Sequence, residues 1–362
     1  MKNTLSIKES SGDVKQLALT FIDAFHHSNR PKYLFGNNVF ADAIISAVKI
    51  DGIIDEKASD NDYWGIPFTP LEKVPADALV LVLSGGSPLT ALNKVGSYGL
   101  TCLHYFSFYK HARLPLVPIP FEGNTAAAYK ENSKKYEHIF SLLADTRSQQ
   151  EFEKVLNFRV SLDVTKMQGF TTREDEQYFE SFLNLKQAGE SFVDIGAYDG
   201  FTTESFIQQC PGYTSVDLFE PDPENISVAR QRLEGKKNIF FHEVGLSNHT
   251  GKVSFSQSGS GSSISASGNV SIKLDMLDKV LSGPVSFIKI DIEGGEYEAL
   301  KGACETIREY HPKLAVAVYH HPDDFWKIPE FIMSVRNDYD IFFRHYTESL
   351  YESVMFFVPE TK

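Results

Sequence analysis

The chain has 362 residues, of which 42% are hydrophobic and 23% are charged. At about 150 residues per domain, this length predicts two domains. The composition excludes a wholly disordered chain, a collagen-like fibre and a small disulfide-stapled protein. The net charge of −13 argues against nucleic-acid binding, because such binding relies on lysine and arginine to release counterions from phosphates.

The N-terminal segment and the cysteines indicate the cellular compartment. Residues 1–16 are polar and lack the apolar core of a signal peptide. No stretch approaches the ~20 apolar residues that a membrane-spanning helix needs. Cys102, Cys210 and Cys304 are far apart, which suits neither a CxxC metal site nor a disulfide framework. We expect a cytoplasmic protein that does not bind membranes.

The first part of the chain alternates apolar strands with helical segments. Strands are expected at 32–35, 52–54 and 78–83, with a helix at 39–48. Continuous apolar runs are typical of parallel strands buried on both faces, and their alternation with helices predicts a doubly wound sheet. We assign residues 1–124 to this Rossmann-like domain.

Residues 125–190 are expected to form a helical connector that packs against the next domain. Apolar residues recur at helical spacing around 138–143, 152–156 and 178–183.

Residues 191–362 predict a second doubly wound α/β sheet. Its strand candidates are 192–195, 215–219, 239–241, 285–290 and 313–319. Helices fit at 202–209, 223–233 and 297–309. The last two strands, 340–343 and 354–358, follow without a helix between them, which predicts an antiparallel terminal hairpin. The Ser/Gly-rich stretch at 256–267 is typical of a flexible loop, either a plain linker or a substrate-side lid.

A glycine-rich turn follows the first strand of the second sheet. The strand leads into Gly196-Ala197-Tyr198-Asp199-Gly200, and a helix is expected from about Thr202. Glycines let the backbone approach a ligand, and a helix N-terminus offers N–H groups to ligand oxygens. Asp194, at the strand end, is placed to bind a ligand ammonium group directly or through water.

Glu220 follows Gly200 by 20 positions, at the end of the next strand. This is the spacing of the ribose-binding acid in dinucleotide folds, and a carboxylate accepts hydrogen bonds from both ribose hydroxyls. Tyr198 stands where the dinucleotide fingerprint has the glycine that admits a pyrophosphate. The pattern therefore favours an adenosine ligand without a pyrophosphate, such as S-adenosylmethionine. The alternative is a tight turn beside a surface acid.

Candidate catalytic residues follow the next two strands. Asp291 and Glu293 end one strand, and His320 and His321 end the other, at the edge where open α/β sheets bind ligands. A histidine can take a proton from a hydroxyl. Neighbouring strand residues point opposite ways, so one histidine faces the site; His320 is favoured because a turn begins at Pro322. A divalent metal is an alternative, but the spacing matches no specific metal pattern and no metal ligand is assigned.

At these residues the sequence resembles the FkbM family of class I S-adenosylmethionine-dependent methyltransferases. The matching segments are 192–200, 219–222, 245–247 followed by Gly251, 274–275, and 287–296 followed by 300–303. The most specific is Lys289-Ile290-Asp291-Ile292-Glu293-Gly294, and the resemblance extends over 191–359. It implies methyl transfer, usually to oxygen, with sugar or natural-product hydroxyls as common acceptors.

The resemblance also implies roles for individual residues. Asp291 would lie near the transferring methyl, and Tyr198 stands where many relatives have Asn. The candidate catalytic residues are Asp291, His320 and His321. The candidate cofactor-binding residues are Asp194, Gly196, Ala197, Tyr198, Gly200, Thr203, Glu220, Pro221, Gly245 and Leu246, of which Gly245 and Leu246 would border the adenine.

The first domain resembles Rossmann-like domains of sugar-modifying proteins. Its turn at 35–40 keeps one glycine, while Asp55 holds the position of the ribose acid. Substrate recognition or self-association into a homo-oligomer therefore stands beside nucleotide binding as its role.

We thus expect an enzyme that uses S-adenosylmethionine to methylate a hydroxyl of a small molecule or glycan. One alternative is a sugar-nucleotide-modifying protein whose first domain binds NAD or a nucleotide, motivated by Asp55 and Ser84-Gly85-Gly86. The other is a non-catalytic binding module on the same fold.

Overall fold

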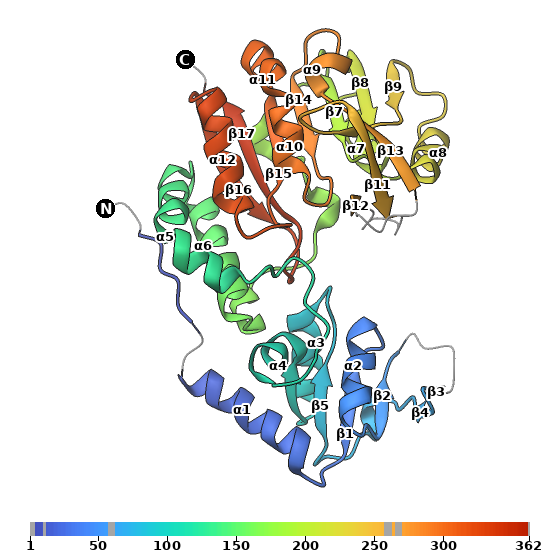
Figure 1. Cartoon of the computed structure of the whole chain (residues 1–362), viewed down its shortest axis with the longest axis vertical. Helices are drawn as coiled ribbons and strands as arrows, with labels where there is room; N and C mark the ends of the chain where they lie inside the picture. Colours follow the sequence, from blue (N-terminus) through green and yellow to red (C-terminus); the bar gives the residue numbers. More distant parts are fainter. Residues whose placement is uncertain (1–3, 10–11, 57–61, 257–262, 265–269, 361–362) are drawn as a thin grey trace.

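Two separate β-sheets, each flanked by helices, organise the chain (Figure 1). The computed structural model describes residues 4–9, 12–56, 62–256, 263–264 and 270–360. No helix among these residues is long and apolar enough to cross a membrane.

The first sheet has the strand order β2-β1-β5-β6, and all its pairs are parallel. Its strands are β1 (Lys32–Phe35), β2 (Gly52–Ile54), β5 (Leu79–Val82) and β6 (Thr101–His104). Its helices are α1 (Gly12–His27), α2 (Val39–Ala47), α3 (Pro88–Ser97) and α4 (Tyr105–His111). The first domain also contains a small separate hairpin, β3 (Asp62–Tyr63) and β4 (Ile66–Pro67), and a 3-10 turn, η1 (Leu71–Lys73). The expected parallel sheet is confirmed, and β5 is buried along its whole length.

The connector begins with two helices, α5 (Thr125–Leu142) and α6 (Thr146–Ser161). Helix α6 packs on β16, and α5 packs on α6 and α12 (Figure 1). The N–H of Ala144 donates to the carbonyl of Ile341 at 2.8 Å. The helical prediction for 178–183 is wrong. After α6 the chain forms only 3-10 turns, η2 (Val164–Met167), η3 (Glu174–Glu176) and η4 (Ser181–Leu183), and Tyr178 adopts a φ of 72°. The apolar side chains there are spaced to pack on the sheet rather than along a helix.

The second sheet has seven strands in the order β16-β17-β15-β14-β7-β8-β9. Its parallel strands are β7 (Ser191–Ile195), β8 (Ser215–Phe219), β9 (Ile239–His242), β14 (Phe287–Ile290) and β15 (Lys313–Ala317). The antiparallel hairpin of β16 (Tyr339–His345) and β17 (Ser353–Pro359) completes the sheet. The α/β fold with an antiparallel terminal hairpin was predicted.

The helices of the second domain depart from expectation at two places. They are α7 (Phe201–Gln209), α8 (Pro223–Arg232), α9 (Leu277–Val280), α10 (Glu296–Lys301), α11 (Cys304–Tyr310) and α12 (Asp324–Val335). The helix expected at 297–309 is broken at Gly302, where a Cβ atom would lie 2.0 Å from the carbonyl oxygen of Ser247. The sequence analysis missed α12, which carries Pro329 inside it.

A further, four-stranded sheet in the second domain was also not predicted. Its order is β10-β13-β11-β12, with β10 (Gly245–Leu246), β11 (Gly251–Ser256), β12 (Ser263–Ile264) and β13 (Val270–Asp275). Most of the stretch considered as a lid, 256–267, lies outside the described residues.

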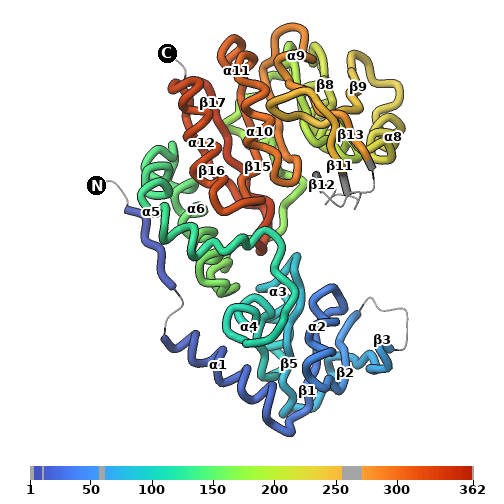
Figure 2. The backbone as a smooth tube through the Cα atoms, viewed as in Figure 1, coloured from blue at the N-terminus to red at the C-terminus, as the bar shows by residue number. Residues whose placement is uncertain are grey.

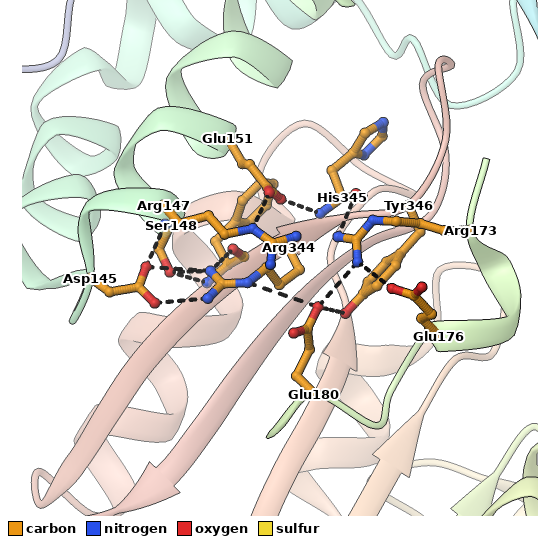
Figure 3. A network of polar contacts seen from close by, with 11 residues as sticks. Asp145, Arg147, Ser148, Glu151, Arg173, Glu176, Glu180, Arg344, His345 and Tyr346 are labelled. Atoms are coloured by element: carbon orange, nitrogen blue, oxygen red, sulfur yellow. Dashed lines mark hydrogen bonds and ion pairs between the residues drawn. The ribbon is translucent and has the colours of Figure 1, made fainter. Parts of the chain in front are cut away.

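The connector and the second domain are joined by a polar network around β16 (Figure 3). The guanidinium group of Arg344 donates to Asp145 at 2.7 Å and to Ser148 at 2.8 Å. The hydroxyl of Tyr346 donates to Glu180 at 3.0 Å. Because Arg344 is nearly fully buried, its ion pair with Asp145 fixes α6 to the strand, and removal of one partner would leave a buried charge.

The first domain contacts the rest of the chain at several points. Residues 4–9 run beside α6, where the N–H of Lys8 donates to Asn157 at 2.8 Å (Figure 2). Thr90 on α3 bonds to Glu348 in the β16–β17 loop through its N–H at 2.9 Å and its hydroxyl at 2.7 Å. One hydrophobic core cluster runs from α1 and the first sheet through α5 and α6 into the second sheet.

Candidate active site

A cavity of about 600 Å³ lies at the carboxyl ends of β7, β8, β14 and β15. This volume is in the range of small-molecule sites. Nine of the thirteen predicted site residues line it: Gly196, Ala197, Tyr198, Glu220, Pro221, Gly245, Leu246, Asp291 and His321. Asp194, Gly200, Thr203 and His320 are absent from its lining.

The glycine turn is pressed against the end of β14. Gly196 has a φ of 77°, and a Cβ atom there would lie 1.9 Å from the carbonyl oxygen of Asp291. Only glycine fits this position, because both the left-handed backbone and the close contact exclude a side chain. The turn thereby holds Asp291 beside the cavity.

The N–H groups of the turn are mostly used inside the protein, contrary to the expectation that they await ligand oxygens. Gly196 and Ala197 donate to the carbonyl of Phe219 at 3.0 and 3.1 Å. Tyr198 donates to Glu220 at 3.0 Å, and Phe201 donates to the side chain of Asp199 at 3.1 Å. The turn therefore presents little of the donor array that holds phosphates.

The structure gives Asp194 partners within the protein. Its side chain is fully buried, accepts from the hydroxyl of Thr203 at 2.7 Å and lies 3.4 Å from the ammonium group of Lys289. Lys289 also donates to the carbonyl of Gly196 at 2.7 Å. The ammonium partner of Asp194 is thus Lys289 of the protein itself. This ion pair stabilises the glycine turn through the hydrogen bond of Lys289 to Gly196.

Glu220, which follows β8, lines the cavity and is largely buried. Its two carboxylate oxygens accept from the N–H groups of Tyr198, at 3.0 Å, and Asp222, at 2.9 Å. Burial raises the pKa of Glu220, and these hydrogen bonds oppose the change. Because a carboxylate has about four acceptor sites, it can still accept from a ligand diol.

The cavity has an apolar wall next to Glu220. Gly245 and Leu246 of β10 and Ile272 and Leu274 of β13 line it. A Cβ atom at Gly245 would lie 2.9 Å from the side chain of Leu274, so glycine permits the close approach of these two strands. An apolar slot beside a carboxylate suits a flat base attached to a ribose.

Acidic side chains gather around His320 at the far end of the cavity. Nε2 of His320 is 3.6 Å from Oδ1 of Asp291 and 3.6 Å from Oε2 of Glu293. Its Nδ1 is 3.1 Å from Oε1 of Glu296. Burial lowers the pKa of His320, but the three carboxylates outweigh this effect and raise it to about 10. Burial also raises the pKa of Glu293, to about 7.

The preference for His320 over His321 is not supported. His320 is 4% exposed and lies behind the carboxylates, whereas His321 is exposed and lines the cavity. The alternation rule does not apply, because β15 ends at Ala317 and both histidines lie in the loop after it. The His321 ring lies close to Gly294, where a Cβ atom would be 2.7 Å from Nε2.

Sequence reasoning missed two residues that touch this end of the cavity. The hydroxyl of Tyr178 donates to Oδ2 of Asp291 at 2.5 Å. Glu352, in the β16–β17 loop, accepts from Gln177, and burial together with the charge of Asp291 raises its pKa to about 8. Tyr178 lies in the segment that was expected to be helical, and no local signal marked Glu352.

A second cavity, of about 400 Å³, adjoins the first. The two share Gly294, Glu298 and His321 in their linings. The other wall comes from α10, α12 and the connector, and includes Tyr297, Asp323 and Lys327.

Comparisons with known proteins agree with this architecture. The family model described as methyltransferase FkbM domain matches residues 194–346. The crystal structure of methyltransferase FkbM from Methylobacillus flagellatus KT is similar over 98% of this chain and 94% of that chain, with 22% identity and a TM-score of 0.74. It shares the fold along nearly the whole length. No curated protein matches the chain in sequence.

Weaker similarities involve other methylases. An rRNA methylase from Streptococcus thermophilus has 13% identity and a TM-score of 0.34, covering 50% of this chain and 92% of that chain. Aeropyrum pernix fibrillarin with bound S-adenosyl-L-methionine has 12% identity and a TM-score of 0.32, covering 47% of this chain and 67% of that chain. These two similarities are too low to support an argument.

Proposed function

We propose that the chain, whose residues 194–346 match the methyltransferase FkbM domain model, is an S-adenosylmethionine-dependent methyltransferase acting on a hydroxyl group of a sugar, glycan or other small polar molecule. The observation that carries this proposal is the charge of the main cavity. Six acidic residues line it: Asp199, Glu220, Asp291, Glu293, Glu298 and Glu352. Lys289, which also lines it, is already paired with Asp194.

This charge selects among adenosine cofactors. S-adenosylmethionine carries a sulfonium and an ammonium group, so an acidic cavity attracts it. A dinucleotide carries a pyrophosphate, which the same carboxylates repel and which the largely occupied N–H groups of the turn would not hold. The apolar slot at Leu246 and the carboxylate of Glu220 fit the adenine and ribose, so the residues present fit the cofactor.

The first domain offers less for a nucleotide than the alternative hypothesis requires. Its strand ends face the β16–β17 loop, since Thr90 is bonded to Glu348 and a Cβ atom at Gly86 would lie 3.0 Å from the Tyr351 hydroxyl. The amide of Asn38 donates to the carbonyl of Leu83 at 2.7 Å. These contacts place part of this edge against the β16–β17 loop, which favours a role in docking or acceptor recognition.

When bound, the cofactor supplies a methyl group on an electrophilic sulfonium. Glu220 would accept hydrogen bonds from the ribose hydroxyls, and Asp291 and Glu293 line the same cavity. His321, exposed between the two cavities, replaces His320 as the base that accepts the acceptor's hydroxyl proton. Orientation and exclusion of water by the cavity walls contribute the rest of the acceleration.

The second cavity is the acceptor subsite in this proposal. It joins the main cavity at His321 and Gly294, so an acceptor there would present a hydroxyl toward the base. Its wall combines the ring of Tyr297 with the polar side chains of Asp323 and Lys327. Such a mixture suits a polyhydroxylated molecule, and its acidity disfavours a nucleic acid.

Calorimetry with S-adenosylhomocysteine tests the cofactor site. We expect binding to the full-length protein, weakened at least tenfold (about 1.4 kcal/mol) in Glu220→Gln. Glu224→Gln, an exposed acid on the following helix, is the matched control and should bind as the wild type does. Absence of binding to the wild type, or equal affinity in Glu220→Gln, would contradict the proposal.

Transfer of labelled methyl to a panel of sugars and glycans tests the acceptor class. In this assay His321→Gln should lose turnover while keeping its affinity for S-adenosylhomocysteine. If the cofactor binds but no panel member is methylated, the non-catalytic module becomes the better account.

A further inference from the structure

Some buried polar atoms in the group around His320 lack a hydrogen-bond partner. Nε2 of His320 and Oε2 of Glu296 are buried without a hydrogen-bond partner, whereas Nδ1 of His320 lies 3.1 Å from Oε1 of Glu296. Both residues are well over nine-tenths buried. Among the described residues, Asp291, Glu296 and His320 each bring one ligand atom to within 4.8 Å of one another. Polar atoms buried in this way are costly unless something satisfies them.

The charges of the group are also unbalanced. Asp291, Glu293 and Glu296 surround one imidazole at 3.1 to 3.6 Å. Even a protonated ring would neutralise one of three carboxylates. Lys289, a few residues away, is committed to Asp194 and to the carbonyl of Gly196. A further positive charge would balance the remaining carboxylates of this group.

Two distances from Nε2 of His320 match a coordination site. Two ligand atoms bound at about 2.1 Å to one ion, at an angle of about 110–120°, lie about 3.4–3.6 Å apart. Nε2 of His320 lies 3.6 Å from an oxygen of Asp291 and 3.6 Å from an oxygen of Glu293. These separations are too long for direct hydrogen bonds.

We propose that Oδ1 of Asp291, Oε2 of Glu293 and Nε2 of His320 bind a divalent first-row transition-metal ion at the acceptor end of the cavity. Glu296 faces the other ring nitrogen, at 3.1 Å. It is itself held by the N–H groups of Ile292 and Gly294, at 2.8 and 3.3 Å.

Glu296 thus completes the carboxylate–histidine–metal arrangement that orients ligating histidines. Tyr178 does the same for Asp291, by donating to the oxygen that does not face His320. His320 and Asp291 are therefore each oriented by a polar side chain on the side that faces away from the proposed ion.

The donor set indicates which ions bind. One imidazole and two carboxylates suit manganese, iron, cobalt or zinc, whereas magnesium and calcium prefer oxygen ligands alone. Asp291 and Glu293 line the cavity, so an acceptor hydroxyl could complete the coordination and lose its proton more readily. This use of the ion rests on the proposed methyl transfer; the binding of the ion does not.

Metal binding is measured on the full-length protein after removal of metals with a chelator. Mn²⁺ titration followed by electron paramagnetic resonance should show one tightly bound ion per chain, with Mg²⁺ a poor competitor. Glu293→Gln and His320→Gln should each weaken Mn²⁺ binding at least tenfold. Co²⁺ bound to the wild type should show an absorption band that shifts in His320→Gln, because its nitrogen ligand is lost.

His311→Gln is the matched control. His311 also lies beside a carboxylate, with Nε2 at 3.2 Å from Asp338, but outside the cavity, and the substitution should leave Mn²⁺ affinity unchanged. Circular dichroism checks that the variants fold. If His320→Gln does not fold, the Mn²⁺ affinity of Glu293→Gln still tests the proposal, because Glu293 is partly exposed. Absence of bound Mn²⁺, or wild-type affinity in Glu293→Gln, would overturn the proposal.

S-adenosylhomocysteine affinity, measured on the same samples, separates the two proposals. If the nucleoside binds and Mn²⁺ does not, the metal site is wrong and the cofactor site stands. If Mn²⁺ binds and the nucleoside does not, the reverse holds.

Discussion

Substitution of Gly196 by alanine should disrupt the cofactor site far more than its size suggests. The added Cβ atom would lie 1.9 Å from the carbonyl oxygen of Asp291, whereas real Cβ atoms essentially never approach below 3.0 Å. The ends of β7 and β14 would have to separate by about 1.1 Å. The hydrogen bond from the N–H of Asp291 to the carbonyl of Ile195, at 3.1 Å, spans the same gap and would be stretched.

Gly235 provides a matched control, because it has the same φ of 77° and no atom within 4 Å of an added Cβ. Alanine in the left-handed region costs about 1–2 kcal/mol at either position. Overpacking adds about 1–3 kcal/mol at Gly196 alone. Gly196→Ala should therefore lower the free energy of unfolding by about 2–5 kcal/mol, and Gly235→Ala by about 1–2 kcal/mol.

Urea unfolding and calorimetry with S-adenosylhomocysteine measure the two effects. Gly196→Ala should also lose at least tenfold in affinity, since the clash moves both the turn and Asp291, while Gly235→Ala keeps wild-type affinity. Equal destabilisation by the two substitutions, with unchanged affinity in both, would refute the reasoning that the turn is fixed by its contact with β14.

Three further outcomes follow from contacts described above. Tyr178→Phe removes the hydrogen bond to Asp291 and should lower turnover about tenfold while leaving S-adenosylhomocysteine affinity within about twofold; wild-type initial rates would contradict a positioning role. Thr90→Val removes the 2.7 Å hydrogen bond to Glu348 and should lower the free energy of unfolding in urea by about 1–2 kcal/mol. Burial lowers the pKa of His104 from 6.5 to about 4, so the unfolded chain binds the proton first. Stability should be full above pH 6.5 and fall by about 3 kcal/mol by pH 4, and thermal melting of His104→Gln should show a smaller decrease over the same range.

The part of the site that could be predicted is carried by short continuous segments. A strand, a glycine turn, a helix and an acid 20 positions later specify the cofactor end, because each feature is local. Asp291 followed from its place at a strand end. The parallel sheets followed from runs of apolar residues, which need no knowledge of the partner strand.

Features that depend on contacts between distant residues were not predictable. Asp194 is directly opposite Lys289 in the register of β7 and β14, and without that register it was interpreted as a ligand-binding residue. The preference for His320 relied on strand alternation, which does not apply because β15 ends before the two histidines. Glu352 reaches the cavity only because the β16–β17 loop folds back, and nothing in the sequence around it indicates this.

The β16–β17 loop couples the docking of the first domain to ligand binding in the main cavity. Glu348 is bonded to α3, and Glu352, four positions later, lines the main cavity. A ligand that shifts this short loop must alter the docking of the first domain, and by reciprocity the state of that docking must alter the affinity for the ligand. The first domain would then influence the cavity even if it binds no small molecule. Separating the domains would change the affinity for the cofactor without altering any residue that holds the adenosine.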